Sequence, residues 1–369
     1  MQTVVTIGCA NMTCICIQIK GVGHTEWSKS GKPVTTLDAS SKIYMGHEEY
    51  FRSNIYVAGS SSGHGQIELT PGKHVYKFDC PLPPVLPSSF EGPFGYVRYT
   101  VKVTLERPWK FDHEKKMAFT IVNILDLNRN PLYKEPIQIQ MEKKFSCLCC
   151  TSAPVSVDIR SPISGYAPGQ FVPIRIYVEN PSDTTIDLVK IYLKRLTIYR
   201  ATSSPDAVKK TEDVIFTVED GPLQGKTLRV DDQYRQLPPT PPSNLAYCNI
   251  INLTYHIYVE CQVSGCHTNF SAKQCMTVGT VPILGMPAQT IPPGLDPRVV
   301  PTDPEGIPIV YPPYQILYET LTDPVYERCR YKSRDLKERD ESEYVMIQGP
   351  ENFAPYCPTY AAIEAPPFL

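Results

Sequence analysis

Residues 95–106 read "GYVRYTVKVTLE", and apolar and polar side chains alternate along this whole stretch. A period of two places successive side chains on opposite faces of a strand, so the pattern predicts a half-buried strand of an antiparallel sheet. The expected buried row is Val97, Tyr99, Val101, Val103 and Leu105, and the opposite row is Tyr96, Arg98, Thr100, Lys102 and Thr104.

The same alternation recurs in "FVPIRIYVEN" (171–180) and "INLTYHIYVEC" (251–261). Turn signals such as "TPGKH", "NRNP", "YAPGQ" and "NPSDT" separate the strand-like segments. No long amphipathic helix pattern occurs before residue 320. These features favour an all-β fold with two antiparallel sandwiches over any alternation of strands and helices.

The composition agrees with this class. The 369 residues are enough for two domains and a tail, and the 37 prolines are about twice the usual share. A net charge of -2 gives no overall attraction to nucleic acid or to an anionic membrane. The 13 cysteines follow no disulfide framework, and no secretory signal or long apolar run is evident. We therefore expect a reducing cytosol and free thiols.

The chain divides near "KKFSCLCCTSAPVSVDIR" (143–160). A first set of strands ends at about residue 145, and a second runs from about 153 to 285. Beyond it the chain becomes proline-rich and then highly charged, as in "YERCRYKSRDLKERDESEY" (326–344). This part lacks the periodic apolar face needed to offset the entropy of ordering, so we expect a disordered tail over 286–369.

Several motifs give the strand sets a family resemblance. The segment "LPSSFEGPFGYVRYTVKVTLERPWKF" (86–111) strongly resembles the central signature of the α-arrestins, the arrestin domain-containing proteins. Further matches are "GVGHTEWSKS", "CLCCTSAPVSVDI", "GYAPGQFVPIRIYVENPSDTTI" and "VGTVPIL", in the family's order, so the resemblance spans about residues 14–285. It implies two tandem arrestin-like, immunoglobulin-type β-sandwich lobes: an N-like lobe (1–145), a cysteine-bearing hinge (146–152) and a C-like lobe (153–285), before the tail.

One departure from the family lies at the N-terminus. Family members have several strands before the segment that matches "CICIQIKG", whereas 13 residues precede Cys14 here. The resemblance therefore implies an N-like lobe without its opening strands, with unpaired edges and an incomplete core. We expect an alternative start or partial gene model, and a chain that expresses poorly unless something caps the edge.

The resemblance implies a non-catalytic trafficking adaptor. It would be cytoplasmic and associate peripherally with the plasma membrane and endosomes, linking receptors or transporters to HECT-type ubiquitin ligases with WW domains and to clathrin adaptors. The sequence contains no His-x-x-x-His pair, glycine-rich phosphate loop or nucleophile elbow, so we expect no enzyme, no cofactor and no metal. The alternatives are a regulatory scaffold, a thiol-dependent, thioredoxin-binding-like signalling protein, or a nonproductive truncated isoform.

Two groups of thiols allow competing interpretations. Cys147, Cys149 and Cys150 form a candidate hinge thiol cluster, open to S-acylation; zinc binding with Cys261 and Cys266 is disfavoured, because adjacent cysteines ligate awkwardly. Cys248 lies where one α-arrestin subtype pairs with thioredoxin. A buried structural cysteine is the favoured interpretation there, because the residue begins an apolar strand.

Basic residues provide two further candidate surfaces. The segment "KIYLKRLTIYR" (190–200) contains Lys190, Lys194, Arg195 and Arg200, a candidate patch for anionic lipids. Ordinary solvated strand residues are the favoured alternative. Arg98 and Lys102 oppose the apolar row of their strand and are weak candidates for binding a partner on the concave side of the sheet.

The tail contains weak versions of a WW-domain ligand. No Pro-Pro-x-Tyr motif is present, but the looser x-Pro-x-Tyr spacing occurs three times. WW domains grip a polyproline II segment and a tyrosine in separate pockets, and several weak copies gain from multivalency. The candidate residues are Tyr311, Pro312, Tyr314, Pro324, Tyr326, Pro358 and Tyr360.

The tail also contains candidate sorting signals of the Tyr-x-x-apolar type, which clathrin adaptors bind as an extended strand. They read "YQIL", "YETL", "YVMI" and "YAAI", and ordinary tail tyrosines are a fair alternative for any one copy. Tyr314 belongs to both motif types, so we expect the two readers to compete for it. The residues are Tyr314, Leu317, Tyr318, Leu321, Tyr344 and Ile347, with a fourth copy starting at Tyr360.

Overall fold

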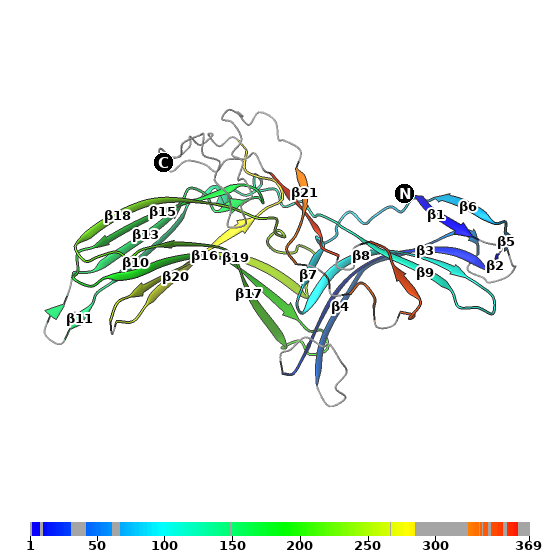
Figure 1. Ribbon diagram of the computed structural model, residues 1–369, viewed down its shortest axis with the longest axis horizontal. Helices are drawn as coiled ribbons and strands as arrows, with labels where there is room; N and C mark the ends of the chain where they lie inside the picture. The colour runs from blue at the N-terminus through cyan, green and yellow to red at the C-terminus, as the bar shows by residue number, and fades with distance from the viewer. Residues whose placement is uncertain are drawn as a thin grey trace.

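The structure is a computed structural model, in which two lobes built from strands lie side by side (Figure 1). In the described residues the strands are joined by turns and by one short 3-10 helix, Pro131–Lys134. None of the described helical residues forms a segment long and apolar enough to cross a membrane. The expected all-β, two-lobed fold is confirmed. The described residues are 2–7, 10–30, 42–60, 67–147, 150–151, 153–265, 267–284, 324–331, 333, 335–338, 341–349 and 353–360.

The N-terminal lobe is built on one broad sheet with the order β22-β9-β8-β3-β4, with β7 also paired to β8. Its long strands are antiparallel, and β22 runs parallel to β9. The bounds are β3 (Cys14–Ser28), β4 (Ile43–Gly59), β7 (Phe90–Gly92), β8 (Gly95–Glu106), β9 (His113–Phe119) and β22 (Val345–Ile347).

A partial second layer accompanies this sheet. Two small ladders join β1 (Gln2–Ile7) to β6 (Gly72–Lys77) and β2 (Ala10–Met12) to β5 (Ile67–Leu69). The ladders contribute to one small apolar cluster, around Met12 and Ile15, and a second one forms around Ile17, Ile19, Phe78 and Val101. A larger cluster joins Trp27, Phe90 and Tyr99 of this lobe to Tyr199 and Leu253 of the C-terminal lobe. The expectation that opening strands are missing stays a prediction.

The C-terminal lobe is a complete two-sheet sandwich. One sheet has the order β10-β13-β15-β18, and the other β14-β20-β19-β16-β17. The inward side chains of both sheets form one continuous core. The bounds are β10 (Ile137–Lys143), β13 (Val155–Ser161), β14 (Gly165–Tyr166), β15 (Phe171–Asn180), β16 (Ile186–Arg200), β17 (Val208–Asp220), β18 (Thr227–Gln236), β19 (Ile251–Val263) and β20 (Phe270–Val278).

The cysteine-bearing segment does not separate the lobes, which corrects the predicted boundary. Strand β10 pairs with β13 from Ile137↔Ser161 to Lys143↔Val155, so it belongs to the C-terminal lobe. The short β11 (Ser146–Cys147) and β12 (Cys150–Thr151) extend this hairpin to the end of the lobe farthest from its neighbour (Figure 1). Strand alternation shows which side chains are buried but not which sheet a strand joins.

The described part of the tail is ordered and packs on both lobes, contrary to the expected disorder of these residues. Strand β21 (Val325–Arg328) pairs with β23 (Tyr356–Thr359) and lies between the lobes, while β22 extends the sheet of the N-terminal lobe (Figure 1). Cys329 and Cys357 form a disulfide, which corrects the expectation that all thiols are free. We call the described residues between 324 and 360 the strap. Its buried residues are Leu336 and a few other single positions, followed by two short continuous runs, 353–355 and 357–360, so they produce no periodic signal in the sequence.

Candidate functional site

The polar face of the N-terminal sheet carries four basic side chains from three adjacent strands. Lys20 lies on β3, Arg98 and Lys102 on β8, and Lys116 on β9. The strand register pairs Lys102 with Lys116, and it pairs Lys20 with Thr100. Thr100 and Lys102 are two residues apart on β8 and therefore point to the same side, so the three lysines share one face of the sheet. Lys116 and Arg98 are only 2% and 4% exposed. Arg98 and Lys102 thus occupy the polar face, as the sequence predicts, but the strap covers much of it.

Acidic residues of the strap neutralise these bases. Glu338 contacts Lys20 at 2.7 Å and Lys116 at 3.2 Å, and Glu341 contacts Lys116 at 2.9 Å. Burial alone would raise the pKa of Glu338, but Lys20 and Lys116 outweigh it and lower that pKa to about 2. Glu338 therefore binds as a carboxylate at neutral pH.

Two further bases on this face have partners within the lobe. The buried Arg98 makes a bidentate pair with Glu91, at 2.8 and 2.9 Å, and also donates to the Asp335 carbonyl at 2.9 Å. Lys102 contacts Glu114 at 3.1 Å. Because Glu91 already neutralises Arg98, the strap offers this arginine only an uncharged backbone carbonyl, that of Asp335. The carboxylates of the strap contact Lys20 and Lys116 instead.

Backbone pairing reinforces this contact. The register of β22 matches Val345 to Glu114, Met346 to Lys115 and Ile347 to Lys116. The Gln348 N–H donates to the Lys116 carbonyl at 2.8 Å. The strap thereby covers the outer edge of β9, which would otherwise present unpaired backbone groups. Sequence reasoning missed Glu338 and Glu341, because no local pattern in the sequence pairs them with Lys20 and Lys116.

A second contact of the strap lies where the lobes meet. Arg195 on β16 is 1% exposed and contacts Asp213 at 3.0 Å. Its guanidinium lies 4.3 Å from the centre of the Tyr331 ring and 5.7 Å from that of Phe90. Tyr331 donates its hydroxyl to Asp213. Burial, followed by this hydrogen bond, raises the pKa of Tyr331 to about 12. One cation thus connects both lobes and the strap.

The burial of Arg195 removes it from the candidate lipid patch. Lys190 and Lys194 alternate with it and lie on the opposite, outer face of β16 with Arg200. Lys190 contacts Glu219 at 3.1 Å, and Lys194 lies 4.1 Å from the centre of the Tyr258 ring. The structure therefore brings together three of the four candidates, and part of their charge is neutralised.

The third contact buries one docking motif. Tyr360 is 4% exposed, and its hydroxyl donates to the Thr280 carbonyl at 2.8 Å while its N–H donates to the Pro168 carbonyl at 2.8 Å. Gly169, at φ +92°, lies beneath it, where an added Cβ would approach the Tyr360 backbone to 2.7 Å. Pro358 is buried as well. The proline and the tyrosine of the x-Pro-x-Tyr copy that ends at Tyr360 are thus covered in this structure, whereas the rest of the "YAAI" copy that starts there lies outside the described residues.

The other motif tyrosines differ in exposure. Tyr326 is 57% exposed on β21, next to the half-buried Pro324. Tyr344 is 56% exposed, with its ring 4.8 Å from that of Phe111, and Ile347 is half-buried in β22. The remaining motif residues, Tyr311, Pro312, Tyr314, Leu317, Tyr318 and Leu321, lie outside the described residues.

The candidate thiols are dispersed. Cys248 is half-buried, packs near Tyr50 in an apolar cluster, and has a pKa raised chiefly by burial. A raised pKa leaves little thiolate, the nucleophilic form, at neutral pH. Cys147 pairs with Cys150 in backbone register, while Cys149 and Cys266 lie outside the described residues. Over the part of the chain that is described, no three His, Cys, Asp or Glu side chains gather as metal ligands.

Comparison with known proteins matches both lobes. Residues 4–128 match the N-terminal domain of arrestin (or S-antigen), and residues 151–283 match its C-terminal domain. Arrestin domain-containing protein 17 of Caenorhabditis elegans is 31% identical over 67% of this chain and 58% of its own length. Arrestin domain-containing protein 4 of Mus musculus is 27% identical over 73% of this chain and 64% of its own length. Arrestin domain-containing protein 1 of Homo sapiens is 27% identical over 72% of this chain and 60% of its own length. The chain thus spans less than two thirds of each relative.

Proposed function

This chain belongs to the α-arrestin branch of the arrestin family, and from that premise we propose that it is a non-catalytic, cytoplasmic adaptor. Its lobes bind a membrane cargo, such as a receptor or transporter, while its tail recruits HECT-type ubiquitin ligases with WW domains and clathrin adaptors. Cargo binding brings the protein to the plasma membrane and endosomes.

The observation that carries the proposal is the unequal exposure of the tail motifs. The strap holds Tyr360 against the C-terminal lobe but leaves Tyr326 on the surface. Pro324 and Tyr326 have the spacing a WW groove requires. A single x-Pro-x-Tyr copy binds weakly, so recruitment depends on several copies engaging several WW domains of one ligase. Among the described residues, the x-Pro-x-Tyr motif that ends at Tyr326 is the one exposed enough to make the first contact with a WW domain.

Membrane attachment in this proposal depends on cargo more than on lipid. Lys190, Lys194 and Arg200 share the outer face of β16, but Lys190 and Lys194 lie close to Glu219 and Glu212. Exposed basic residues attract anionic headgroups by about 1 kcal/mol each, and nearby carboxylates reduce that attraction. The patch would therefore orient the protein at a membrane that cargo has already brought near.

The thiol-dependent alternative has less support. Cys248 is half-buried, and burial raises the pKa of its thiol. Both properties oppose the attack on a disulfide that pairing with thioredoxin needs.

The test is a pull-down of the full chain with a ligase fragment that contains several WW domains. We expect binding by the wild type, a severalfold loss in Tyr326→Ala, and a near-complete loss when Tyr314 and Tyr360 are also changed to alanine. The matched control is Tyr344→Ala, because Tyr344 is a similarly exposed strap tyrosine outside any x-Pro-x-Tyr motif. Absence of wild-type binding, or binding untouched by the triple change, would remove ligase recruitment from the proposal.

A further inference from the structure

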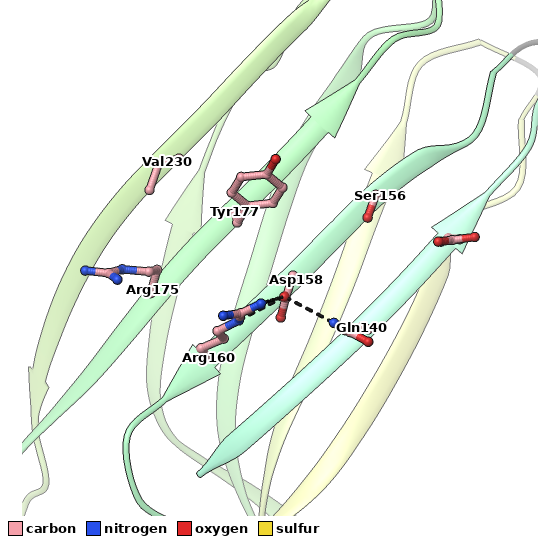
Figure 2. Close-up of a pocket in the computed structure, with 8 residues that line it drawn as sticks. Gln140, Ser156, Asp158, Arg160, Arg175, Tyr177 and Val230 are labelled. Carbon is pink, nitrogen blue, oxygen red and sulfur yellow. Dashed lines mark hydrogen bonds and ion pairs between the residues drawn. The ribbon is translucent and has the colours of Figure 1, made fainter. Parts of the chain in front are cut away.

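One sheet of the C-terminal lobe presents a polar hollow to the outside. The hollow measures about 550 Å³ and lies on the face of β10, β13 and β15 that points away from the core (Figure 2). Strand register arranges the face in three rows across the sheet. The rows are Gln138–Arg160–Arg175–Asp232, Gln140–Asp158–Tyr177–Val230 and Glu142–Ser156–Glu179–Leu228. We call this surface the polar basin.

Asp158, in the middle of the basin, has an unused acceptor. Its side chain lies between Arg160 and Gln140 (Figure 2). Oδ2 accepts from Arg160 at 2.6 and 2.9 Å and from Gln140 at 3.3 Å. Oδ1 is buried and has no hydrogen-bond partner among the described residues. Asp158 is 6% exposed as a whole, and a buried acceptor without a donor is costly, so the site favours an additional donor.

The charges of the basin are unequal. Its two arginines already have carboxylates: Arg175 makes a bidentate pair with Asp232, at 2.8 and 2.9 Å, and Arg160 pairs with Asp158. Glu142 and Glu179, in the third row, have no ion-pair partner in the described part of the chain. Four carboxylates against two guanidinium groups leave an excess of two negative charges, so the basin is complementary to a cation.

Apolar groups lie next to these carboxylates. Tyr177 lines the hollow beside Asp158, and Val230, 55% exposed, continues the same row onto β18. Leu228, 63% exposed, is the corresponding residue of the third row. The methylene stem of a lysine or arginine packs on such groups while its charged end reaches a carboxylate, and a tyrosine ring also attracts a cation.

We propose that the polar basin binds a basic peptide segment, with one lysine or arginine donating to Asp158 Oδ1 and a neighbouring one meeting Glu142 and Glu179. Arg160, whose side chain is 54% exposed, contacts Oδ2 and is the cation that competes with the peptide for the charge of the Asp158 carboxylate. This inference rests on the proposed adaptor function, because the cytoplasmic segments that flank membrane spans are rich in lysine and arginine. The basin would then be the surface that recognises cargo.

The test measures binding of the full chain to a fluorescent peptide of eight residues, four of them arginine, by fluorescence anisotropy. A peptide with glutamate at those four positions is the charge-reversed probe. We expect the arginine peptide to bind, and the affinity to fall about tenfold in Asp158→Asn and similarly in the double variant Glu142→Gln, Glu179→Gln. Arg160→Ala removes the competing cation and should tighten binding, and added salt should weaken it.

Controls separate the basin from other causes. Glu219→Gln removes an exposed carboxylate from the other sheet of the same lobe and should leave the affinity unchanged. Thermal unfolding checks that each variant is folded. Preference for the glutamate peptide, no binding of the arginine peptide, or equal binding by wild type and folded basin variants would overturn the proposal. The ligase pull-down depends on tail tyrosines alone, so either result stands independently of the other.

Discussion

The two lobes share one kind of strand but differ in how they stay folded. In the C-terminal lobe, two sheets enclose a continuous core, and inward residues such as Ile174, Ile191 and Val259 are at most 1% exposed. The N-terminal lobe is one broad sheet with a partial second layer, and its apolar side chains are divided between two small clusters and a larger one that it shares with the C-terminal lobe, around Trp27, Tyr99 and Tyr199. Its polar face and its β9 edge are covered by the strap.

This difference shows that the same alternating pattern supports two sources of stability. Where two sheets meet, burial of apolar area in a shared core dominates. Where one sheet lacks a full partner, ion pairs and an added strand from a distant segment supply part of the cover. We therefore expect the C-terminal lobe to respond mainly to core substitutions and the N-terminal lobe to changes in the strap.

The largest expected effect is in the core of the C-terminal lobe. Ile191→Ala removes a fully buried side chain and should lower the free energy of unfolding of that lobe by about 2–5 kcal/mol, through lost burial and the cavity left behind. Denaturant unfolding measures it. Leu228→Ala, on the exposed face of the same lobe, is the control and should change stability by less than about 0.5 kcal/mol. Equal effects at both positions would contradict a core-based lobe.

The next effect concerns the strap. Glu338→Gln removes the carboxylate shared by Lys20 and Lys116 and should lower the stability of the strap contact by about 1–3 kcal/mol. Limited proteolysis should then cut the strap faster while the C-terminal lobe stays intact. Glu343→Gln, an exposed glutamate of the same segment, should leave the cleavage rate unchanged. Faster cleavage of Glu343→Gln as well would mean that the overall negative charge of the strap, rather than the contact of Glu338 with Lys20 and Lys116, keeps the strap bound to the lobe.

Lowering the pH should weaken the contact of Glu338 with Lys20 and Lys116. The pKa of Glu338 is about 2 in the folded protein, below its usual value of about 4.3. Its contribution is therefore fully present above about pH 4.3 and is lost as the pH falls towards 2. The difference in denaturant midpoint between wild type and Glu338→Gln should persist from pH 7 to 5 and narrow below that range. A difference that stays constant down to pH 3 would show that Glu338 does not act as a carboxylate.

The smallest effect is expected at the C-terminal anchor. Tyr360→Phe keeps the buried ring but removes the hydrogen bond to the Thr280 carbonyl, a loss of about 1 kcal/mol. Hydrogen exchange over residues 353–360 should become faster. Tyr326→Phe alters an exposed hydroxyl and should leave that exchange as it is.

Much of the fold could be predicted from alternation. The segments at 95–106, 171–180 and 251–261 became β8, β15 and most of β19, because a period of two is a direct consequence of strand geometry. The same period places Arg195 out of phase with Lys190 and Lys194, so its burial was predictable from the sequence. Membership of a sheet was not, and β10 was therefore assigned to the wrong lobe.

The docking of the strap could not be predicted for a physical reason. Its buried residues are a few single positions and two short runs, 353–355 and 357–360, and the groups that they contact lie far away in the sequence. Glu338, for example, contacts Lys20. Neither local propensity nor periodicity contains such a pairing. Consequently, the covered state of Tyr360 also became visible only in three dimensions.

The most direct test of the dependence of the N-terminal lobe on the strap is hydrogen exchange over the full chain, with wild type compared with the double variant Glu338→Gln, Glu341→Gln. We expect residues 113–119 of β9 and 345–348 of the strap to lose protection together in the variant, while β16 and β19 of the C-terminal lobe keep theirs. Unchanged protection of β9 in the variant would contradict this expectation.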